Sequence, residues 1–211
     1  CTFHRGRDFR TVVAQQHSPA VDASRIEALE DLTHHRLYAG ITAEELTEML
    51  DVIEANVVKR WNRWLLAAAA AIACASFAVL NFFTPPAILL VALAAFCGQL
   101  TRAVLHGKHV HQLGCIVAAG TVASLVYFLT TEAVAAAGVA DPSEFSSGYV
   151  AAVLFLIPGF PLFSALIDLA RFDFEAGLSR LTYALTVITA ATFTVALVSW
   201  TTELTPEPGI P

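Results

Sequence analysis

The chain has 211 residues, of which 56% are hydrophobic and only 14% are charged. This apolar content exceeds what one soluble core needs, so the sequence predicts that lipid surrounds most of the chain. The net charge of −6 comes without a cluster of Lys and Arg residues, and this excludes nucleic acid as a partner.

The polar and apolar residues divide the chain into regions with different surroundings. We expect a cytoplasmic N-terminal region over residues 1–62, a transmembrane domain of five helices over residues 63–202, and a C-terminal linker over residues 203–211. The predicted fold class is all-α integral membrane. The transmembrane helices are preceded by a polar region with two amphipathic helices and one short strand. Because the chain opens on Cys1 without an initiator Met, we expect a fragment of a longer protein.

The N-terminal region begins with a strand-like alternation over residues 8–14. From residue 23 to about residue 38, apolar side chains recur every three positions, which predicts a surface helix with one apolar stripe. Asp22 is a candidate N-cap of this helix, and Gly40 supplies a C-terminal stop.

A second helix is predicted from residue 42 onward. Thr42 and Glu45 have the spacing of a capping box, in which each side chain accepts a hydrogen bond from a backbone N–H at a helix start. An apolar stripe follows at helical spacing, and the helix could run directly into the membrane. Three tryptophans at the ends of apolar runs are predicted to be interface anchors: Trp61, Trp64 and Trp200.

Five apolar runs follow, and each approaches the ~20 residues that a helix needs to cross about 30 Å of hydrocarbon. The runs lack the period-two alternation of a membrane β-barrel, so helices are predicted. They cover residues 65–83, 86–105, 113–131, 149–169 and 181–200.

Positive charges predict the orientation, because Lys and Arg next to membrane spans are retained in the cytoplasm. They precede the first run, separate the second from the third, and separate the fourth from the fifth. The connection between the first and second runs, the connection between the third and fourth runs, and the C-terminal tail contain no Lys or Arg. The N-terminus is therefore predicted to be cytoplasmic and the C-terminus to be outside.

The fourth run contains Pro158, Gly159 and Pro161. Each proline removes a backbone donor, so the carbonyls of Leu154 and Ile157 are predicted to lose their usual partners and the span to be broken. Secondary transporters build substrate and ion sites at such breaks near the middle of the membrane. A proline kink that serves only packing is the alternative.

Asp168 is the acid inside a predicted span, and such carboxylates usually face a cavity, a partner charge or a proton path. Ser164 lies on the same face of the half-helix that follows Pro161. Alternatively, Asp168 lies at the cytoplasmic end of its span and pairs with Arg171 or Arg180.

Other polar residues inside the runs give weaker predictions. Gln99 needs a polar partner, and three threonines in the fifth run form a hydroxyl stripe that favours packing over a polar path: Thr182, Thr186 and Thr189. Three glycines permit close helix approach: Gly98, Gly114 and Gly120.

The cysteines and histidines do not predict a metal site. Cys74, Cys97 and Cys115 lie in apolar runs and lack ligand spacing, and the histidine groups have no structural-zinc pattern. Nucleotide-binding and hydrolase motifs are also missing, so the sequence predicts neither an enzyme nor a cofactor.

Three segments carry a resemblance to a known family: residues 158–161 (PGFP), 168–173 (DLARFD) and 175–180 (EAGLSR). With the capped helices before the first span, they resemble the threonine/serine exporter family. Phe172 stands where that family is expected to have a glycine before Asp173.

The resemblance implies a five-span half-transporter of the cytoplasmic membrane. Such a half joins a second five-span half, fused or separate, or forms homo-oligomers, and it exports threonine or serine by using the proton gradient. Some relatives move dicarboxylates instead, and a membrane scaffold that does not transport is a further alternative. Substrate contacts are expected from Pro158, Gly159, Pro161, Ser164, Asp168 and Gln99. Coupling and gating are expected from Asp168, Arg171, Asp173, Gly177 and Arg180.

Overall fold

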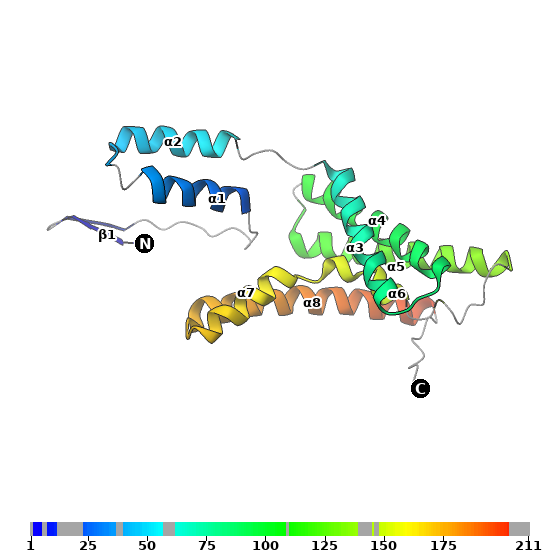
Figure 1. Ribbon diagram of the computed structural model, residues 1–211. Coiled ribbons are helices and arrows are strands. Elements are labelled where there is room, and N and C mark those ends of the chain that lie inside the picture. Colours follow the sequence, from blue (N-terminus) through cyan, green and yellow to red (C-terminus); the bar gives the residue numbers. More distant parts are fainter. Residues whose placement is uncertain are drawn as a thin grey trace. The chain divides into compact units, whose positions relative to one another are not determined.

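The structure is a computed structural model, in which contacts divide the chain into two units, Cys1–Arg60 and Trp61–Pro211 (Figure 1). Each unit is described by itself. The described residues are 2–5, 8–11, 23–36, 40–56, 62–108, 110–138, 145 and 148–202. The predicted linker over residues 203–211 lies outside them.

The N-terminal unit opens with a β-hairpin. Strand β1 (Thr2–Arg5) pairs antiparallel with β2 (Asp8–Thr11). The prediction of one strand was therefore incomplete, because the alternation over residues 8–14 marked β2 but gave no sign of β1. Residues 12–14 lie outside the described part of the chain.

The first predicted helix is shorter than expected. Helix α1 spans Ala23–Asp31, and the chain continues as a π-helical turn, η1 (Leu32–Arg36). Leu32 is buried, and the Thr33 hydroxyl donates to the Glu30 carbonyl oxygen at 2.8 Å. The predicted cap Asp22 lies outside the described residues, whereas Gly40 has the left-handed φ of +74° that suits a stop.

Helix α2 (Ala43–Asn56) begins with the predicted capping box. The Thr42 backbone N–H donates to Glu45 Oε2 at 2.9 Å, and the Glu45 N–H donates to Thr42 Oγ1 at 3.3 Å. The Thr42 hydroxyl also donates to Glu45 Oε2 at 3.0 Å, and the bonds that the carboxylate accepts from the Thr42 backbone N–H and hydroxyl lower the pKa of Glu45. The capping box is therefore confirmed.

The second unit is all-α, as predicted for an integral membrane protein. Among the described residues, four helices are long and apolar enough to cross a membrane: α3 (Arg63–Leu80), α4 (Pro85–Gly107), α5 (Gln112–Ala136) and α8 (Phe174–Thr202). A fifth region consists of three short pieces, α6 (Gly148–Ala152), η4 (Leu154–Leu156) and α7 (Gly159–Ala170). The α6–η4 part and α7 are bent by 66° relative to each other.

Helices α3 and α4 are joined by a tight turn that ends α3 before the predicted boundary at residue 83. The Phe82 N–H donates to the Val79 carbonyl at 3.0 Å, and the Phe83 N–H donates to the Ala78 carbonyl at 3.1 Å. This is a Schellman motif, which requires a left-handed residue, and Phe82 has a φ of +59°.

The helices of this unit pack through small side chains. Helix α4 packs against α3 and α5, α5 also packs against α8, and α8 packs against α7. Alanines fill the contact faces, as expected where helices approach closely in a membrane. The fully buried ones are Ala67, Ala78, Ala87, Ala94, Ala95, Ala119, Ala123, Ala152, Ala165 and Ala184.

A polar contact ties α5 to the start of α6. The Tyr127 hydroxyl donates to the Phe145 carbonyl oxygen at 2.9 Å, and both residues are almost fully buried. A Cβ added at Gly148 would lie 1.9 Å from the Tyr127 hydroxyl oxygen. Only glycine therefore fits at this position.

Candidate functional site

The bend between η4 and α7 is centred on Pro158. Pro158 has a φ of −80° and a ψ of 66°, which is the conformation of an inverse γ-turn. The Gly159 N–H donates to the Ile157 carbonyl at 2.9 Å, and the Ile157 N–H donates to the Leu154 carbonyl at 3.1 Å. The two carbonyls lose the partners that they would have in a regular helix, as predicted, and the break supplies local replacements.

The two prolines differ in their structural effects. Pro158 precedes α7, whereas Pro161 lies within its first turn, where a backbone N–H has no partner inside the helix. The Pro158 carbonyl accepts from the Leu162 N–H at 3.1 Å, so α7 is regular around Pro161. Pro158 produces the bend, and Pro161 costs α7 little.

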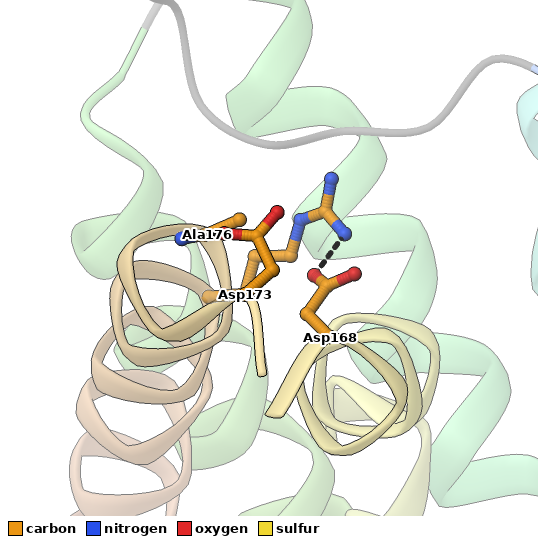
Figure 2. A network of polar contacts seen from close by, with 4 residues as sticks. Asp168, Asp173 and Ala176 are labelled. Carbon is orange, nitrogen blue, oxygen red and sulfur yellow. Dashed lines mark hydrogen bonds and ion pairs between the residues drawn. The ribbon is translucent and has the colours of Figure 1, made fainter. Parts of the chain in front are cut away.

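Asp168 lies near the other end of α7 and forms an ion pair across the turn to α8. Its Oδ2 atom is 2.5 Å from Nη1 of Arg180, and Figure 2 shows this contact between the two neighbouring helices. The Asp168 side chain is 20% exposed and the Arg180 side chain is 45% exposed. Of the two partners considered from sequence, Arg180 makes the contact, while Arg171 caps α7 through its backbone N–H.

The turn from α7 to α8 is a second Schellman motif. The Phe172 N–H donates to the Leu169 carbonyl at 3.1 Å, and the Asp173 N–H donates to the Asp168 carbonyl at 2.9 Å. Phe172 has a φ of +63°, which explains why a glycine is expected there in the family.

Asp173 and Gly177 also stabilise this turn. The Asp173 carboxylate accepts from the Ala176 N–H at 3.3 Å and caps α8, which therefore begins seven residues before the predicted start at residue 181 (Figure 2). A Cβ at Gly177 would lie 2.8 Å from Leu169 Cγ and 3.1 Å from the Leu169 backbone nitrogen. Gly177 thus lets α8 approach α7 closely.

The structure separates the predicted site residues into two places. Gly159 and Asp168 lie at opposite ends of α7, ~13 Å apart along the helix axis. Ser164 lies between them and is half-buried. Gln99 is on α4 beside Gly98, whose added Cβ would lie 2.7 Å from Phe155 Cζ in η4. The chain neighbour of Gln99 therefore lies against η4, which precedes the bend.

Gln99 and Ser124 carry buried polar atoms without a hydrogen-bond partner in the described part of the chain. Gln99 was selected from the sequence, but Ser124 was not, although it is the serine of an otherwise apolar stretch of α5. Sequence reasoning also missed the hydrogen bond between Gln112 and Tyr183, which joins α5 to α8 over 71 positions. Nothing local marks such a pair.

The threonine stripe of α8 lies on its exposed side. Thr182, Thr186 and Thr189 are all exposed, and the Thr186 hydroxyl donates to the Thr182 carbonyl at 2.8 Å. This hydroxyl is therefore satisfied within its own helix. Within the described residues, no group of three His, Cys, Asp or Glu side chains is arranged to hold a metal ion.

Comparison with known proteins gives a family for the chain. A family described as "Putative threonine/serine exporter" matches residues 1–201. The protein named "Probable succinate transporter subunit YjjP" of Escherichia coli (strain K12) is 30% identical over 151 residues, which is 67% of this chain and 54% of that protein. The match thus spans about half the length of this relative. No solved structure matches the chain. The chain belongs to the threonine/serine exporter family.

Proposed function

We propose that the chain is half of a secondary transporter that exports threonine or serine across the cytoplasmic membrane. Helices α3, α4, α5 and α8 are four of its spans, and the bent α6–η4–α7 region is the fifth. The N-terminus lies in the cytoplasm and the C-terminus outside, because the positive charges beside the helices fall on one side. Those charges are Arg63, Arg102, Lys108, Arg171 and Arg180.

The 66° bend at Pro158 is the observation that carries this proposal. A broken span is tolerated in a membrane when its backbone groups have partners, and the γ-turn at Pro158 supplies them. The bend leaves the N-terminal end of α7 as a helix start inside the membrane. Such starts carry positive partial charge and receive anionic substrate groups in secondary transporters.

A substrate carboxylate fits this end of α7. Gly159 is exposed, and no atom would lie within 4 Å of an added Cβ, so a ligand can approach this end of α7, while the Gly159 N–H itself donates to the Ile157 carbonyl. Pro158, Pro161 and Ser164 form the surroundings of the site. The unpartnered amide oxygen of Gln99 would accept a hydrogen bond from the substrate ammonium or hydroxyl group.

Asp168 is assigned to coupling, although the sequence also placed it in the substrate site. It is ~13 Å along α7 from Gly159, farther than one threonine molecule reaches. When ionised, Asp168 attracts Arg180 and keeps α7 and α8 together. Protonation removes that attraction and frees the turn formed by Arg171, Asp173 and Gly177. Proton flow would thereby change the α7–α8 connection.

A dicarboxylate exporter is the second candidate. The relative that matches 67% of this chain is named as a succinate transporter subunit. Both substrate classes carry a carboxylate for the start of α7, so the ammonium group is the distinguishing feature. The word "subunit" in that name also favours assembly with a second half, whether separate, fused or a second copy.

The test measures efflux of labelled threonine and succinate from proteoliposomes that contain the full transporter, with and without a pH gradient. Threonine efflux should rise with an imposed proton gradient, and Asp168→Asn should abolish that increase. A rate of threonine efflux that does not change with the pH gradient would refute the coupling proposal. If the transporter exports succinate in preference to threonine, the proposed substrate is a dicarboxylate and not an amino acid.

Two proline variants provide a matched pair for the bend. Pro158→Ala allows α6 and α7 to straighten and should reduce efflux strongly. Pro161→Ala lies in the first turn of α7 and should retain most of it. Equal losses in both variants would contradict the role given to the bend.

A further inference from the structure

The short helix η4 lies against two glycines on neighbouring helices. A Cβ at Gly98 of α4 would lie 2.7 Å from Phe155 Cζ, and a Cβ at Gly120 of α5 would lie 3.2 Å from Leu156 Cδ1. A Cβ at Gly98 would thus overlap Phe155, and it would also lie 2.8 Å from Ala123 Cβ on α5, whereas a Cβ at Gly120 would be tight against Leu156 without a severe overlap. We call Gly98 and Gly120, with the surfaces around them, the glycine seat.

Other helices complete the surroundings of η4. Leu156 is 1% exposed and packs in the core with Ile116, Ala119 and Val187. Phe155 packs against a buried cluster that includes Cys74 of α3. Contacts from α3, α4, α5 and α8 therefore hold η4 on several sides.

Helix α7, on the other side of Pro158, is held differently. It makes its main contacts with α8 alone, through Ala165 and the close approach of Leu169 to Gly177. The bend thus separates a piece that is enclosed by the bundle from a piece whose main contacts are with α8. The direction of α7 at Pro158 depends on where η4 is fixed.

We propose that Gly98 and Gly120 are positioning residues that fix η4 and thereby hold the start of α7 in its substrate-binding geometry. This inference rests on the proposed function, because the start of α7 is the proposed substrate site. Neither glycine is expected to touch the substrate. Their effect is transmitted through Phe155 and Leu156 to Pro158.

The natural cysteines report the position of η4 without added probes. Cys74 is 1% exposed beneath η4, and Cys115 is 2% exposed near the start of α5. Alkylation by N-ethylmaleimide, followed at each cysteine by peptide mass spectrometry, measures how often each thiol is uncovered. Displacement of η4 should expose Cys74 and leave Cys115 protected, whereas general loosening should expose both.

Gly98→Ala should raise the alkylation rate of Cys74 about tenfold, because its Cβ would overlap Phe155 of η4 as well as Ala123 Cβ of α5. Gly120→Ala gives a milder overlap and should raise the rate about threefold. Gly114→Ala on α5 is the matched control, since its Cβ would meet only Val110 Cγ1 at 3.5 Å. This variant should leave the rate unchanged.

A second substitution that compensates Gly120→Ala distinguishes a displaced η4 from a general loss of structure. Leu156→Val removes the Cδ1 atom that an alanine at position 120 would meet at 3.2 Å and leaves Thr194 Cγ2 at 3.3 Å, so the double variant should restore part of the Cys74 protection. In efflux assays, Gly120→Ala should raise KM for the substrate more than it lowers the maximal rate, and the double variant should reverse this change.

The inference fails if Gly98→Ala and Gly120→Ala both leave Cys74 as protected as the Gly114→Ala control does. It also fails if Cys115 becomes exposed together with Cys74, or if Leu156→Val rescues neither readout. Alkylation does not require transport. A chain that exports no amino acid would therefore refute the proposed function, while the alkylation rate of Cys74 would still test the role of the glycine seat.

Discussion

Phe172 in the turn between α7 and α8 allows a direct test of backbone strain. It has a φ of +63°, which L-residues rarely adopt, and its side chain is exposed. Its ring makes an edge contact with Phe174 at a centroid distance of 6.1 Å. Phe172→Gly removes the ring and the strain together, whereas Phe172→Ala removes the ring and keeps the strained Cβ.

The magnitude follows from three contributions. The left-handed conformation costs a residue with a Cβ about 1–2 kcal/mol, and glycine relieves this cost. Glycine loses about 0.5–1 kcal/mol more than alanine through chain entropy on folding. Loss of the exposed aromatic contact costs about 0.5 kcal/mol in both variants. Phe172→Gly should therefore be more stable than Phe172→Ala by about 0.5–1 kcal/mol.

Equilibrium unfolding of the detergent-solubilised protein in SDS, followed by circular dichroism, measures this difference. Phe82 has a φ of +59° in the other Schellman turn and provides an independent repeat with the same pair of substitutions. If Phe172→Gly is no more stable than Phe172→Ala, the left-handed strain does not limit the stability of this turn and the reasoning is wrong.

Three further predictions concern separate contacts. A double-mutant cycle of Asp168→Asn and Arg180→Gln should give a coupling energy of about 1 kcal/mol in SDS unfolding. The value is modest because the ion pair is only partly shielded from water. The pKa of Glu45 is lowered from its ordinary value of 4.5, so the ionised carboxylate stabilises α2 fully at pH values above 4.5. This contribution is lost as the pH falls through the lowered value, so the helix content of a peptide covering residues 40–56 should drop there by circular dichroism, and Glu45→Gln should lack the step. Tyr127→Phe should cost about 1–3 kcal/mol in SDS unfolding, because it leaves the buried Phe145 carbonyl without its donor.

Each of these predictions has its own contrary result. Additive effects of the two charge substitutions would show that Asp168 and Arg180 do not interact in solution. Parallel pH curves for the wild-type peptide and Glu45→Gln would remove the capping contribution of that carboxylate. An unchanged unfolding midpoint for Tyr127→Phe would mean that another group satisfies the carbonyl.

Local patterns predicted the parts of the fold whose causes lie within a few residues. The hydrogen bonds between Thr42 and Glu45 depend only on a three-residue spacing, so the capping box could be predicted in full. The bend at Pro158 was equally predictable, because proline acts on its own backbone. The partners of the nearby carbonyls were not, since the γ-turn forms only after the helix is broken.

Contacts across the chain could not be assigned from the sequence. Arg171 is closer than Arg180 to Asp168 along the chain, but the left-handed residue Phe172 reverses the chain direction and brings Arg180 to the carboxylate. Gly98 and Gly120 were recognised as sites of close approach, yet nothing beside them indicated that Phe155 and Leu156 would fill the space. These partners depend on how the helices pack.

The length of α8 has a consequence for the choice of lipid. Its 29 residues extend over ~43 Å, whereas about 30 Å of hydrocarbon needs only about 20 residues. In an upright orientation with Thr202 at one membrane surface, the first ~9 residues of α8, including Arg180, extend into the headgroups of the opposite surface. A bilayer with longer acyl chains would draw the ion pair toward hydrocarbon, so bilayer thickness becomes a variable that acts on this charge pair.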